Sequence, residues 1–337
     1  VMSNRRADAG LFGFDFQVNA AIVLMLENIK TLSSVRLEDN EEDIVLTLDN
    51  KKKILAQAKA VQNGSSDFRN VRANLKKALI TLSEGAQSAD VDKLIFITNS
   101  ANPFNDDRSR SVFYAPTRRK FSDLPPSAQA IIQEYLSTIA QPLDTNDFVI
   151  QVFNFETDDD KERYKVVMQK VNDFIGRLNT TTSPGVGSRL LDTWQNKIFE
   201  NGSKKDAGIT INKKGIIWPL IVLETDISKY DDEYEELFDI GVYEEVTRRY
   251  QTVIDDCCER VDFFTKILYD YREFKSEKKN PKEKNIDFIQ TTWEQYKTEF
   301  MAPSIDDETL EALTQVILYN VLRRRKLIES IRREVNL

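Results

Sequence analysis

The first hundred residues alternate between two hydrophobic periods, and this alternation constrains the fold more than any other feature of the chain. Apolar side chains recur at helical spacing over residues 14–33 and again over 68–84. Between these two segments lie three short strand-like stretches, at 35–38, 44–48 and 53–60, and a buried apolar run follows at 93–98. Helix, three strands, helix and strand is an order that predicts an α/β fold.

Weaker signals extend this α/β pattern to about residue 180. A stretch rich in Asn, Pro, Asp and Ser is expected to be mostly loop, and a helix, a strand and a second helix should follow it. In order, these four segments are 99–127, 127–139, 148–155 and 158–178. The sequence TTTSPGVGS at 180–188 then has the composition of a linker.

Beyond the linker the chain is predicted to be mostly helical. Residues 232–273 carry apolar positions at helical spacing, and 308–335 read as one amphipathic helix. The apolar run 215–224 is the exception, with the pattern of a strand or a short buried segment, and Pro219 would place such a strand at a sheet edge. We therefore predict an α/β domain over 1–180 and a mainly α-helical docking or oligomerisation domain over 188–337.

The residue types that are missing narrow the possible chemistry. The chain has no histidine, which excludes His-based triads, histidine-ligated zinc and histidine general bases. Its two cysteines, Cys257 and Cys258, are adjacent, and sequence neighbours rarely form a disulfide because the geometry is strained. A reduced, cytoplasmic protein is therefore expected. No run of 18 apolar residues occurs, so no membrane span is predicted.

Acidic side chains precede the second predicted strand, and a polar pair ends the third. The sequence from Glu38 to Asp43 reads EDNEED, and the third strand ends Gln57-Ala-Lys59. Gln57 and Lys59 are two residues apart, so they share one face of the strand. A polar pair in an otherwise apolar strand needs a reason. Acids on one strand beside Gln-x-Lys on the next are typical of a metal-dependent phosphodiesterase site.

The chemistry of phosphodiester cleavage explains this choice of residues. Mg²⁺ prefers oxygen ligands, so carboxylates must converge from adjacent strands. A bound divalent metal polarises the phosphate and lowers the pKa of its water. A lysine beside the metal stabilises the developing negative charge or helps to orient the attacking water. Asp43 and Lys59 therefore predict hydrolysis of a phosphodiester.

Together, GFDFQ at 13–17, Glu38 with Asp43, and Gln57 with Lys59 resemble the PD-(D/E)XK endonuclease domain of bacterial anti-phage effectors. These are the Cap-four-like nucleases of CBASS and the nuclease subunits of Lamassu and HerA-coupled systems, with Mrr-type restriction enzymes as more distant relatives. The resemblance covers roughly residues 10–100. It implies a restriction-endonuclease-like fold and cleavage of double-stranded DNA that depends on Mg²⁺ or Mn²⁺.

The same resemblance implies a role for each site residue. Glu38 and Asp43 would be metal ligands, and Gln57 would offer a carbonyl oxygen from the position of the second acid. Lys59 would be the catalytic lysine, and Gln17 would support the site from the first helix. Gln17 stands where Mrr-like enzymes often have glutamate, and Gln57 stands where many nucleases have an acid. The metal-binding acid therefore stays open among Glu38, Glu41 and Glu42.

The net charge of −8 opposes binding of nucleic acid, so a local basic patch or a partner must supply the positive field. Basic residues lie on one polar face of the helix after the third strand, and others lie in the loop-rich stretch. Each set either contacts phosphates or is ordinarily solvated. The residues expected to contact DNA are Arg69, Arg72, Lys76, Arg118 and Arg119.

The predicted helical half bears on whether the chain is more similar to the CBASS nucleases or to the Lamassu nuclease subunits. It holds too little strand-like sequence for the α/β cyclic-oligonucleotide sensor that follows the nuclease in CBASS members. The resemblance therefore favours a Lamassu-like subunit of a defence complex, which an SMC-like or other ATPase keeps inactive until a trigger arrives. Activation by formation of a homo-oligomer is compatible with this arrangement. The alternatives are a non-catalytic scaffold on a decayed nuclease fold and a nuclease that acts on RNA.

Overall fold

The computed structural model describes residues 4–39, 42–114, 116–178, 182–224, 241, 245, 246, 248, 261–278, 280–300 and 305–337. These residues form two compact units. Apart from the last two residues, the first unit draws on 1–177 and 187–216, and the second on 178–186 and 217–335. The first unit is an α/β domain, and the described part of the second is helical, as the sequence predicts at this coarse level.

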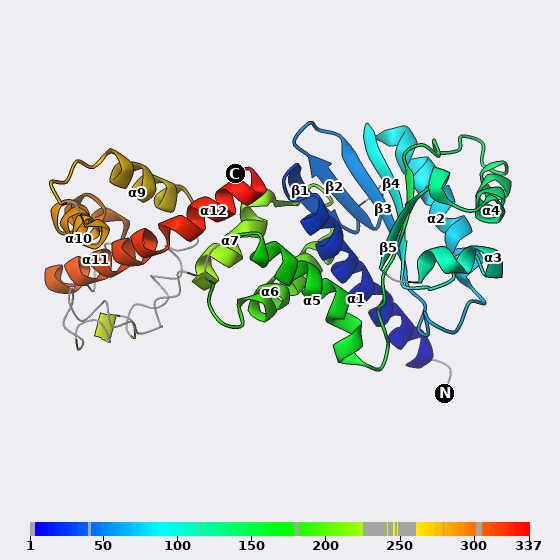
Figure 1. Ribbon diagram of the computed structural model, residues 1–337, viewed down its shortest axis with the longest axis horizontal. Helices are drawn as coiled ribbons and strands as arrows, with labels where there is room; N and C mark the ends of the chain where they lie inside the picture. Colours follow the sequence, from blue (N-terminus) through cyan, green and yellow to red (C-terminus); the bar gives the residue numbers. More distant parts are fainter. Residues whose placement is uncertain are drawn as a thin grey trace. The chain divides into compact units, whose positions relative to one another are not determined.

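A seven-stranded mixed sheet forms the centre of the first unit (Figure 1). Its strand order is β5-β6-β4-β3-β2-β1-β7, in which β3, β4 and β6 are parallel and the other neighbours are antiparallel. The strands are β1 (Leu32–Leu37), β2 (Ile44–Leu48), β3 (Lys53–Lys59), β4 (Val91–Thr98), β5 (Thr117–Lys120), β6 (Phe148–Val152) and β7 (Ile211–Asn212).

Helices cover both faces of this sheet. On one face, α2 (Val71–Ser88) packs on β3 and β4, and α4 (Pro126–Leu136) packs on α2. On the other face, α1 (Asn4–Glu27) packs on β1 and β3, with α5 (Asp160–Gly176) beside it. The helix α6 (Val186–Gly202) also joins this layer, since the rings of Phe14 and Phe199 lie 5.3 Å apart. Figure 1 shows these helices on the two sides of the sheet.

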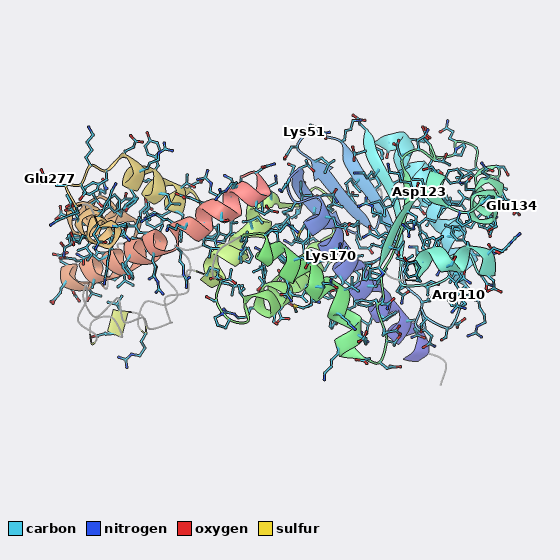
Figure 2. All side chains as sticks on the ribbon, in the orientation of Figure 1. Lys51, Arg110, Asp123, Glu134, Lys170 and Glu277 are labelled. Carbon is cyan, nitrogen blue, oxygen red and sulfur yellow. The ribbon has the colours of Figure 1, made fainter. Side chains whose placement is uncertain are left out.

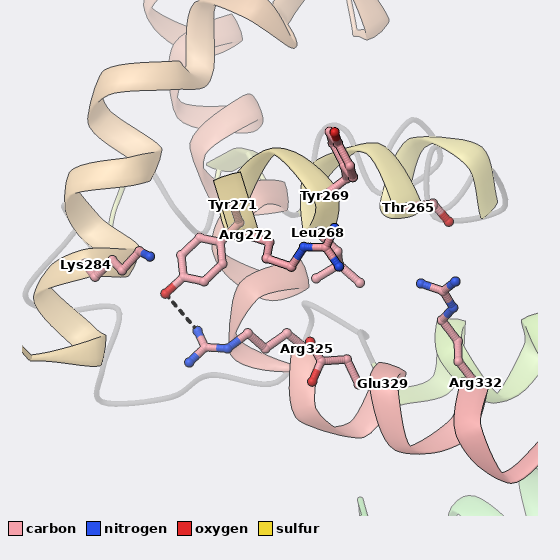
Figure 3. Close-up of a pocket in the computed structure, with 9 residues that line it drawn as sticks. All are labelled: Thr265, Leu268, Tyr269, Tyr271, Arg272, Lys284, Arg325, Glu329 and Arg332. Atoms are coloured by element: carbon pink, nitrogen blue, oxygen red, sulfur yellow. Dashed lines mark hydrogen bonds between the residues drawn. The ribbon is translucent and has the colours of Figure 1, made fainter. Parts of the chain in front are cut away.

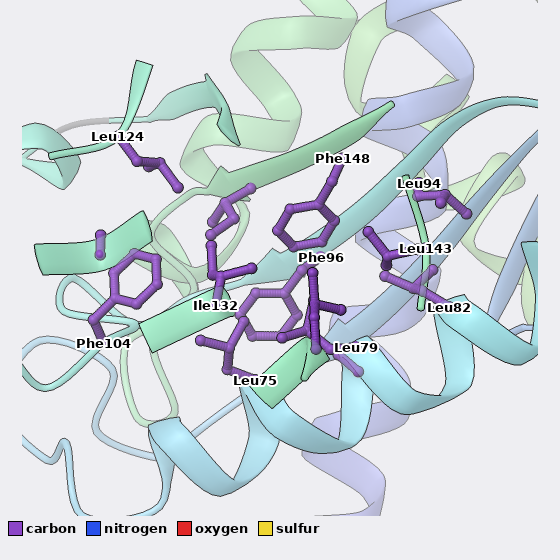
Figure 4. Packing of buried hydrophobic residues seen from close by; sticks show 14 of the residues in the cluster. Leu75, Leu79, Leu82, Leu94, Phe96, Phe104, Leu124, Ile132, Leu143 and Phe148 are labelled. Atoms are coloured by element: carbon purple, nitrogen blue, oxygen red, sulfur yellow. The ribbon is translucent and has the colours of Figure 1, made fainter. Parts of the chain in front are cut away.

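The core on the α2 face is built from alternating positions of the central strands. Leu55, Phe96 and Ile150 belong to β3, β4 and β6, and all three are buried in one apolar cluster. Figure 4 shows Phe96 beside Leu75 and Leu79 of α2. Fully burying such a side chain contributes roughly 1.5–3 kcal/mol relative to leaving it exposed. Because side chains alternate along a strand, this cluster fixes which residues of β3 face α2.

The α1 face has a separate aromatic core. Phe16 of α1 is fully buried, and its ring lies 5.1 Å from that of Phe153 and 5.4 Å from that of Phe155. One α1 segment, Ala9–Glu27, is the single described stretch that is long and apolar enough to cross a membrane by length and composition. Of that segment, 61% is buried inside the protein, so its apolar character is used in packing on the sheet.

The first unit extends past residue 180, where the predicted boundary lies. The reason is Arg36 of β1, which is 2% exposed and donates hydrogen bonds to three backbone carbonyls at the end of α6 and in the segment that follows it. These acceptors are Asn201, Lys204 and Ile209. The short strand β7 then pairs with β1. Residues 187–216 therefore pack with the sheet, whereas the TTTSPGVGS segment has only 182–188 among the described residues.

Residues 215–224 belong to a helix with buried side chains, so the strand alternative is wrong and the alternative of a short buried segment agrees with the structure. The helix α7 (Lys213–Glu224) contains Pro219, which cannot donate a hydrogen bond to the carbonyl of Gly215 four residues earlier. Nζ of Lys197 donates to that carbonyl instead, at 3.2 Å. This substitute donor satisfies the acceptor that the proline leaves without its usual helical partner.

The described part of the second unit contains helices connected by short segments. The predicted helix over 308–335 is two helices, α11 (Asp307–Arg323) and α12 (Arg325–Val335), separated at Arg324. The helix α11 packs with α9 (Val261–Glu273) and α10 (Pro281–Thr292), and Arg325 of α12 bonds to Tyr271 and Asn285 of these helices. An aromatic cluster joins α9 to α10, since the Tyr271 and Phe288 rings lie 5.3 Å apart. Most of residues 232–260, for which a helix is predicted, lie outside the described residues. Both cysteines also lie outside them.

Candidate active site

The strand β3 places two polar side chains on the face that is covered by α2. Leu55 belongs to the α2 core, so Gln57 and Lys59, two and four residues later, point to the same side. Gln57 is 3% exposed, whereas 29% of the Lys59 side chain is exposed. The polar pair therefore lies where the buried part of the strand meets its solvent-accessible end.

The register between β2 and β3 brings Asp43 to this end of the strand. Ile44 pairs with Ala56, so Asp43 lies beside the next residue along β3. Its Oδ2 accepts hydrogen bonds from the backbone N–H of Ala58 and from Nζ of Lys59, both at 3.0 Å. Within the described residues, this oxygen of Asp43 accepts hydrogen bonds and Oδ1 accepts none.

Glu38 joins the site from the end of β1. Its backbone N–H donates to the carbonyl of Asp43 at 2.8 Å, which continues the β1–β2 pairing by one step. Its φ of 52° is left-handed, a conformation that costs a non-glycine residue free energy. Strained backbone of this kind is concentrated at functional sites. Glu38, just after β1, and Asp43, just before β2, are thus neighbours beside Gln57 of β3.

The pKa of Glu38 shows that these groups are electrostatically coupled. Loss of surrounding water raises this pKa most, and the negative charge of Asp43 raises it further. A hydrogen bond from the Gln17 side chain and the charges of Lys59 and Arg36 lower it, but the raising effects dominate. Gln17 of α1 thus reaches the same cluster, and the site holds two carboxylates whose mutual repulsion a cation would relieve.

The positions of Glu41 and Glu42 give little support for either residue as a metal ligand. Glu41 lies outside the described residues, and Glu42 is buried, with 3% of its surface exposed. Among the residues that the structure describes, no group of three or more Asp, Glu or Cys side chains converges in a geometry that would hold a metal ion. Glu38 and Asp43, with the carbonyl oxygen of Gln57, are the residues available to bind one.

No family model matches the chain, and neither a curated protein nor a solved structure is significantly similar to it. Four of the five side chains that the sequence singles out, Gln17, Glu38, Asp43 and Lys59, interact within one cluster. The fifth, Gln57, shares the β3 face with Lys59 and is paired in register with Phe96.

The basic residues on and before α2 differ in their exposure and in their bonding partners. Arg69 is 86% exposed at its side chain and pairs with Asp67 at 2.6 Å, which holds the pKa of Asp67 at about 2. Nε of Arg72 donates to the carbonyl of Phe104 at 2.6 Å, so this guanidinium tethers a loop. Lys76 is exposed, and its Nζ lies 5.7 Å from the centre of the Tyr135 ring.

The two arginines of β5 are also bonded within the protein. Arg118 pairs with Glu27 of α1 at 3.2 Å, and Glu27 binds Lys170 at 2.9 Å as well. Figure 2 labels Lys170, which belongs to α5. Arg118 thus faces the α1 side of the sheet, away from the Gln57 and Lys59 face. Nε of Arg119 donates to the carbonyl of Val112 at 3.3 Å.

One residue that the sequence did not single out positions the backbone after Lys59. Asn99 follows β4, and its Oδ1 accepts from the N–H of Val61 at 2.8 Å. Its Nδ2 donates to the carbonyls of Val61, at 2.8 Å, and Phe155, at 2.9 Å. Asparagine at the end of a predicted buried strand is the only sequence signal for this contact, because the partners are 38 and 56 residues distant.

Proposed function

We propose that the chain is a metal-dependent DNA endonuclease with a restriction-endonuclease-like core, acting as one subunit of an anti-phage or anti-plasmid defence complex. The observation that carries the proposal is the contact of Asp43 with Lys59 at 3.0 Å, with Glu38 and Gln17 coupled to the same cluster. The ends of β1 and β3, the residue before β2 and the helix α1 supply these groups, as the PD-(D/E)XK resemblance requires.

The residues present fit a divalent cation. Glu38 and Asp43 are carboxylates close enough for the charge of one to raise the pKa of the other. Oxygen ligands of this type suit Mg²⁺ or Mn²⁺, and Gln57 adds a carbonyl oxygen. A bound Mg²⁺ would neutralise phosphate charge and lower the pKa of its water.

Each protein group then has a definite task. Asp43 holds the Lys59 side chain in position by an ion pair at 3.0 Å. Lys59 stabilises the negative charge that develops on the phosphate as the bond to the leaving oxygen breaks. Gln17 holds Glu38 in place by its hydrogen bond. Asn99 fixes the backbone that leaves the site at Val61.

The acidic net charge supports a partner-dependent nuclease. At −8, the chain repels duplex DNA over long distances, so an ATPase subunit would supply much of the attraction. The helical second unit provides surface for docking such a partner or another copy of the chain. An SMC-like ATPase that restrains the nuclease until it is triggered fits the Lamassu-like resemblance.

The test is a Lys59→Ala change in the complex purified with the products of neighbouring genes. We expect loss of Mg²⁺-dependent cleavage by at least about 100-fold, because a charged donor to the phosphate is removed. Lys53→Ala, on the same strand and of the same residue type, should cleave like the wild type. Assembly of both variants is checked by size-exclusion chromatography. Wild-type cleavage by an assembled Lys59→Ala complex would show that the site is assigned incorrectly.

A non-catalytic scaffold is the second candidate. It is favoured by the carboxamide of Gln57 at an acid position and by the small number of converging carboxylates in the described residues. A scaffold would assemble with its partners but would leave DNA and RNA intact under every activating condition. Supplying both substrates to the activated complex also separates a DNA nuclease from an RNA nuclease.

A further inference from the structure

A cavity of about 600 Å³ lies within the helical second unit, and no step of the proposed nuclease chemistry uses it (Figure 3). Three helices line it. One face of α9 contributes positions spaced three or four residues apart, α12 contributes a second such face, and α10 contributes one residue. The lining residues are Thr265, Leu268, Tyr269, Tyr271, Arg272, Lys284, Arg325, Glu329 and Arg332.

The charges in this cavity are unbalanced. Among the lining residues that the structure describes, Arg272, Lys284, Arg325 and Arg332 carry four positive charges, and Glu329 is the only carboxylate. The chain as a whole carries −8, so this local excess of positive charge runs against the average composition. Arg272 pairs with Glu273 at 3.4 Å. Because the like charges on separate helices still repel, holding them together costs free energy that an anion would offset.

Two of the cations converge on one aromatic ring. Nζ of Lys284 and the guanidinium carbon of Arg325 each lie 4.9 Å from the centre of the Tyr271 ring. Tyr271 is buried, so its ring is a fixed platform rather than a mobile surface group. Figure 3 shows Tyr271 between these two side chains, with its hydroxyl bonded to Arg325. Cation–π contacts hold both cations in place before any ligand arrives.

Arg325 is held in position by some of its N–H donors, and others have no partner among the described residues. Its Nη1 donates to the Tyr271 hydroxyl at 3.1 Å and to Oδ1 of Asn285 at 2.8 Å. A guanidinium has five N–H donors in a planar fork. Within the described residues, neither Nε nor Nη2 of Arg325 has a hydrogen-bond partner, so the fork has donors left for the two oxygens of a phosphate.

Arg332 completes the cavity from the next turns of α12. It lies seven residues after Arg325, on the same face of the helix, and is exposed. In the part of the chain that the structure describes, its guanidinium forms neither an ion pair nor a hydrogen bond. Arg272 faces it from α9, so two independent helices present arginine to the same space, as Figure 3 shows.

We infer that this cavity binds a phosphate-bearing small molecule of nucleotide size. Three arginines and a lysine recognise phosphate oxygens, and arginine does so in two-point contacts. A volume of about 600 Å³ is far larger than an inorganic phosphate needs and lies within the range of small-molecule sites. Leu268 and the tyrosines supply apolar and aromatic walls for the rest of the ligand.

Isothermal titration calorimetry on the full chain tests this site, with ATP, inorganic pyrophosphate and adenosine as probes. We expect saturable binding of ATP, weaker binding of pyrophosphate and no measurable binding of adenosine. Arg332→Glu should weaken ATP binding at least tenfold, and so should Arg272→Glu from the opposite wall. Arg333→Glu is the matched control, because it makes the same charge change at the adjacent exposed residue outside the cavity. It should alter affinity less than twofold.

Four results would overturn the inference. ATP that gives no saturable binding at millimolar concentration would mean that the cavity does not recognise phosphate. Adenosine that binds as tightly as ATP would show that the cavity does not select for phosphate. Pyrophosphate that binds as tightly as ATP would show that it does not select for a ligand of nucleotide size. Equal losses in Arg332→Glu and Arg333→Glu would indicate general charge attraction. Melting temperatures of the variants show whether each remains folded, and none of these variants touches the proposed nuclease site.

Discussion

One oxygen of Asp43 binds both the ammonium group of Lys59 and the backbone N–H of Ala58, each at 3.0 Å. The carboxylate thereby fixes a side chain and the strand that carries it at the same time. Since Asp43 precedes β2 and Lys59 ends β3, the contact closes the polar end of the sheet. The proposed chemistry depends on this pair being held before any substrate arrives.

Replacing Asp43 with asparagine removes the charge but keeps an oxygen that can accept from Ala58. We expect Asp43→Asn to lower the free energy of unfolding by about 1–2 kcal/mol, because a charge-assisted hydrogen bond becomes a neutral one. Asp90→Asn is the control, since Asp90 is 77% exposed at its side chain and pairs with Lys52 at 3.9 Å. That change should cost less than about 0.5 kcal/mol. Urea unfolding that gives equal values for both variants would contradict the account.

Glu38→Gln should make the metal-free protein more stable at neutral pH. Burial, and then the charge of Asp43, raise the pKa of Glu38, so the fold disfavours its ionised form. This penalty is present above the raised pKa and disappears below the ordinary glutamate pKa. We expect the melting temperature in EDTA to rise by up to about 2 °C at pH 8 and the gain to vanish near pH 4.

The same variant reports on the metal. Mg²⁺ should raise the melting temperature of the wild type, because it binds only the folded protein, and should raise that of Glu38→Gln much less. A thermal shift series in EDTA and in Mg²⁺ measures both effects. A variant that is less stable than the wild type at pH 8 in EDTA, or that responds equally to Mg²⁺, would argue against Glu38 as a strained metal ligand.

Lys76 and Arg118, both predicted to contact DNA, should behave differently when changed to alanine. Lys76 is exposed on α2, so its loss should weaken DNA binding by the assembled complex and lower the slope of log affinity against log salt by about one. Arg118 is bound to Glu27, so its loss should lower stability by about 1–2 kcal/mol and leave that slope unchanged. Fluorescence anisotropy at several salt concentrations, with urea unfolding, separates the two effects. A salt slope that falls for Arg118→Ala alone would reverse this assignment.

Arg36 should be among the most important residues for the stability of the first unit. Arg36→Met keeps the side-chain volume but removes a charged donor from the backbone carbonyls of Asn201, Lys204 and Ile209. The carbonyl of Asn201 keeps the Lys204 N–H as a donor, and that of Ile209 keeps Nδ2 of Asn201. We expect a loss of about 3 kcal/mol or more. The control, Arg69→Met, changes an exposed arginine and should cost less than about 0.5 kcal/mol. Faster proteolysis of residues 203–210 in Arg36→Met would accompany the loss, and similar unfolding curves for both variants would refute it.

The sequence predicts the cluster around Lys59 because the residues that form most of it are close together in the chain. Alternation along β3 places Gln57 and Lys59 on one face, and the short connection from β2 brings Asp43 to the neighbouring position. The central strands are equally predictable from the sequence, since they are apolar runs of ordinary strand length. Gln17 is different, because only the family resemblance indicated that the first helix would reach the site.

The features that sequence reasoning missed depend on contacts between distant parts of the chain. The strand β5 is four residues of Thr, Arg and Lys, with no apolar alternation, and only pairing with β6 makes it a strand. Arg36 finds its acceptors 165 and more residues later. Pro219 is tolerated within a helix because Lys197 satisfies the carbonyl of Gly215. No local pattern carries such information.

The most direct test of the nuclease proposal is the rate of cleavage of linear duplex DNA by the activated complex, with wild-type chain and with Lys59→Ala. The account predicts cleavage by the wild type in Mg²⁺, none in EDTA, and a rate at least about 100-fold lower for the assembled Lys59→Ala complex. Cleavage that persists in EDTA, or that Lys59→Ala leaves unchanged, would contradict a metal-dependent site built on Asp43 and Lys59.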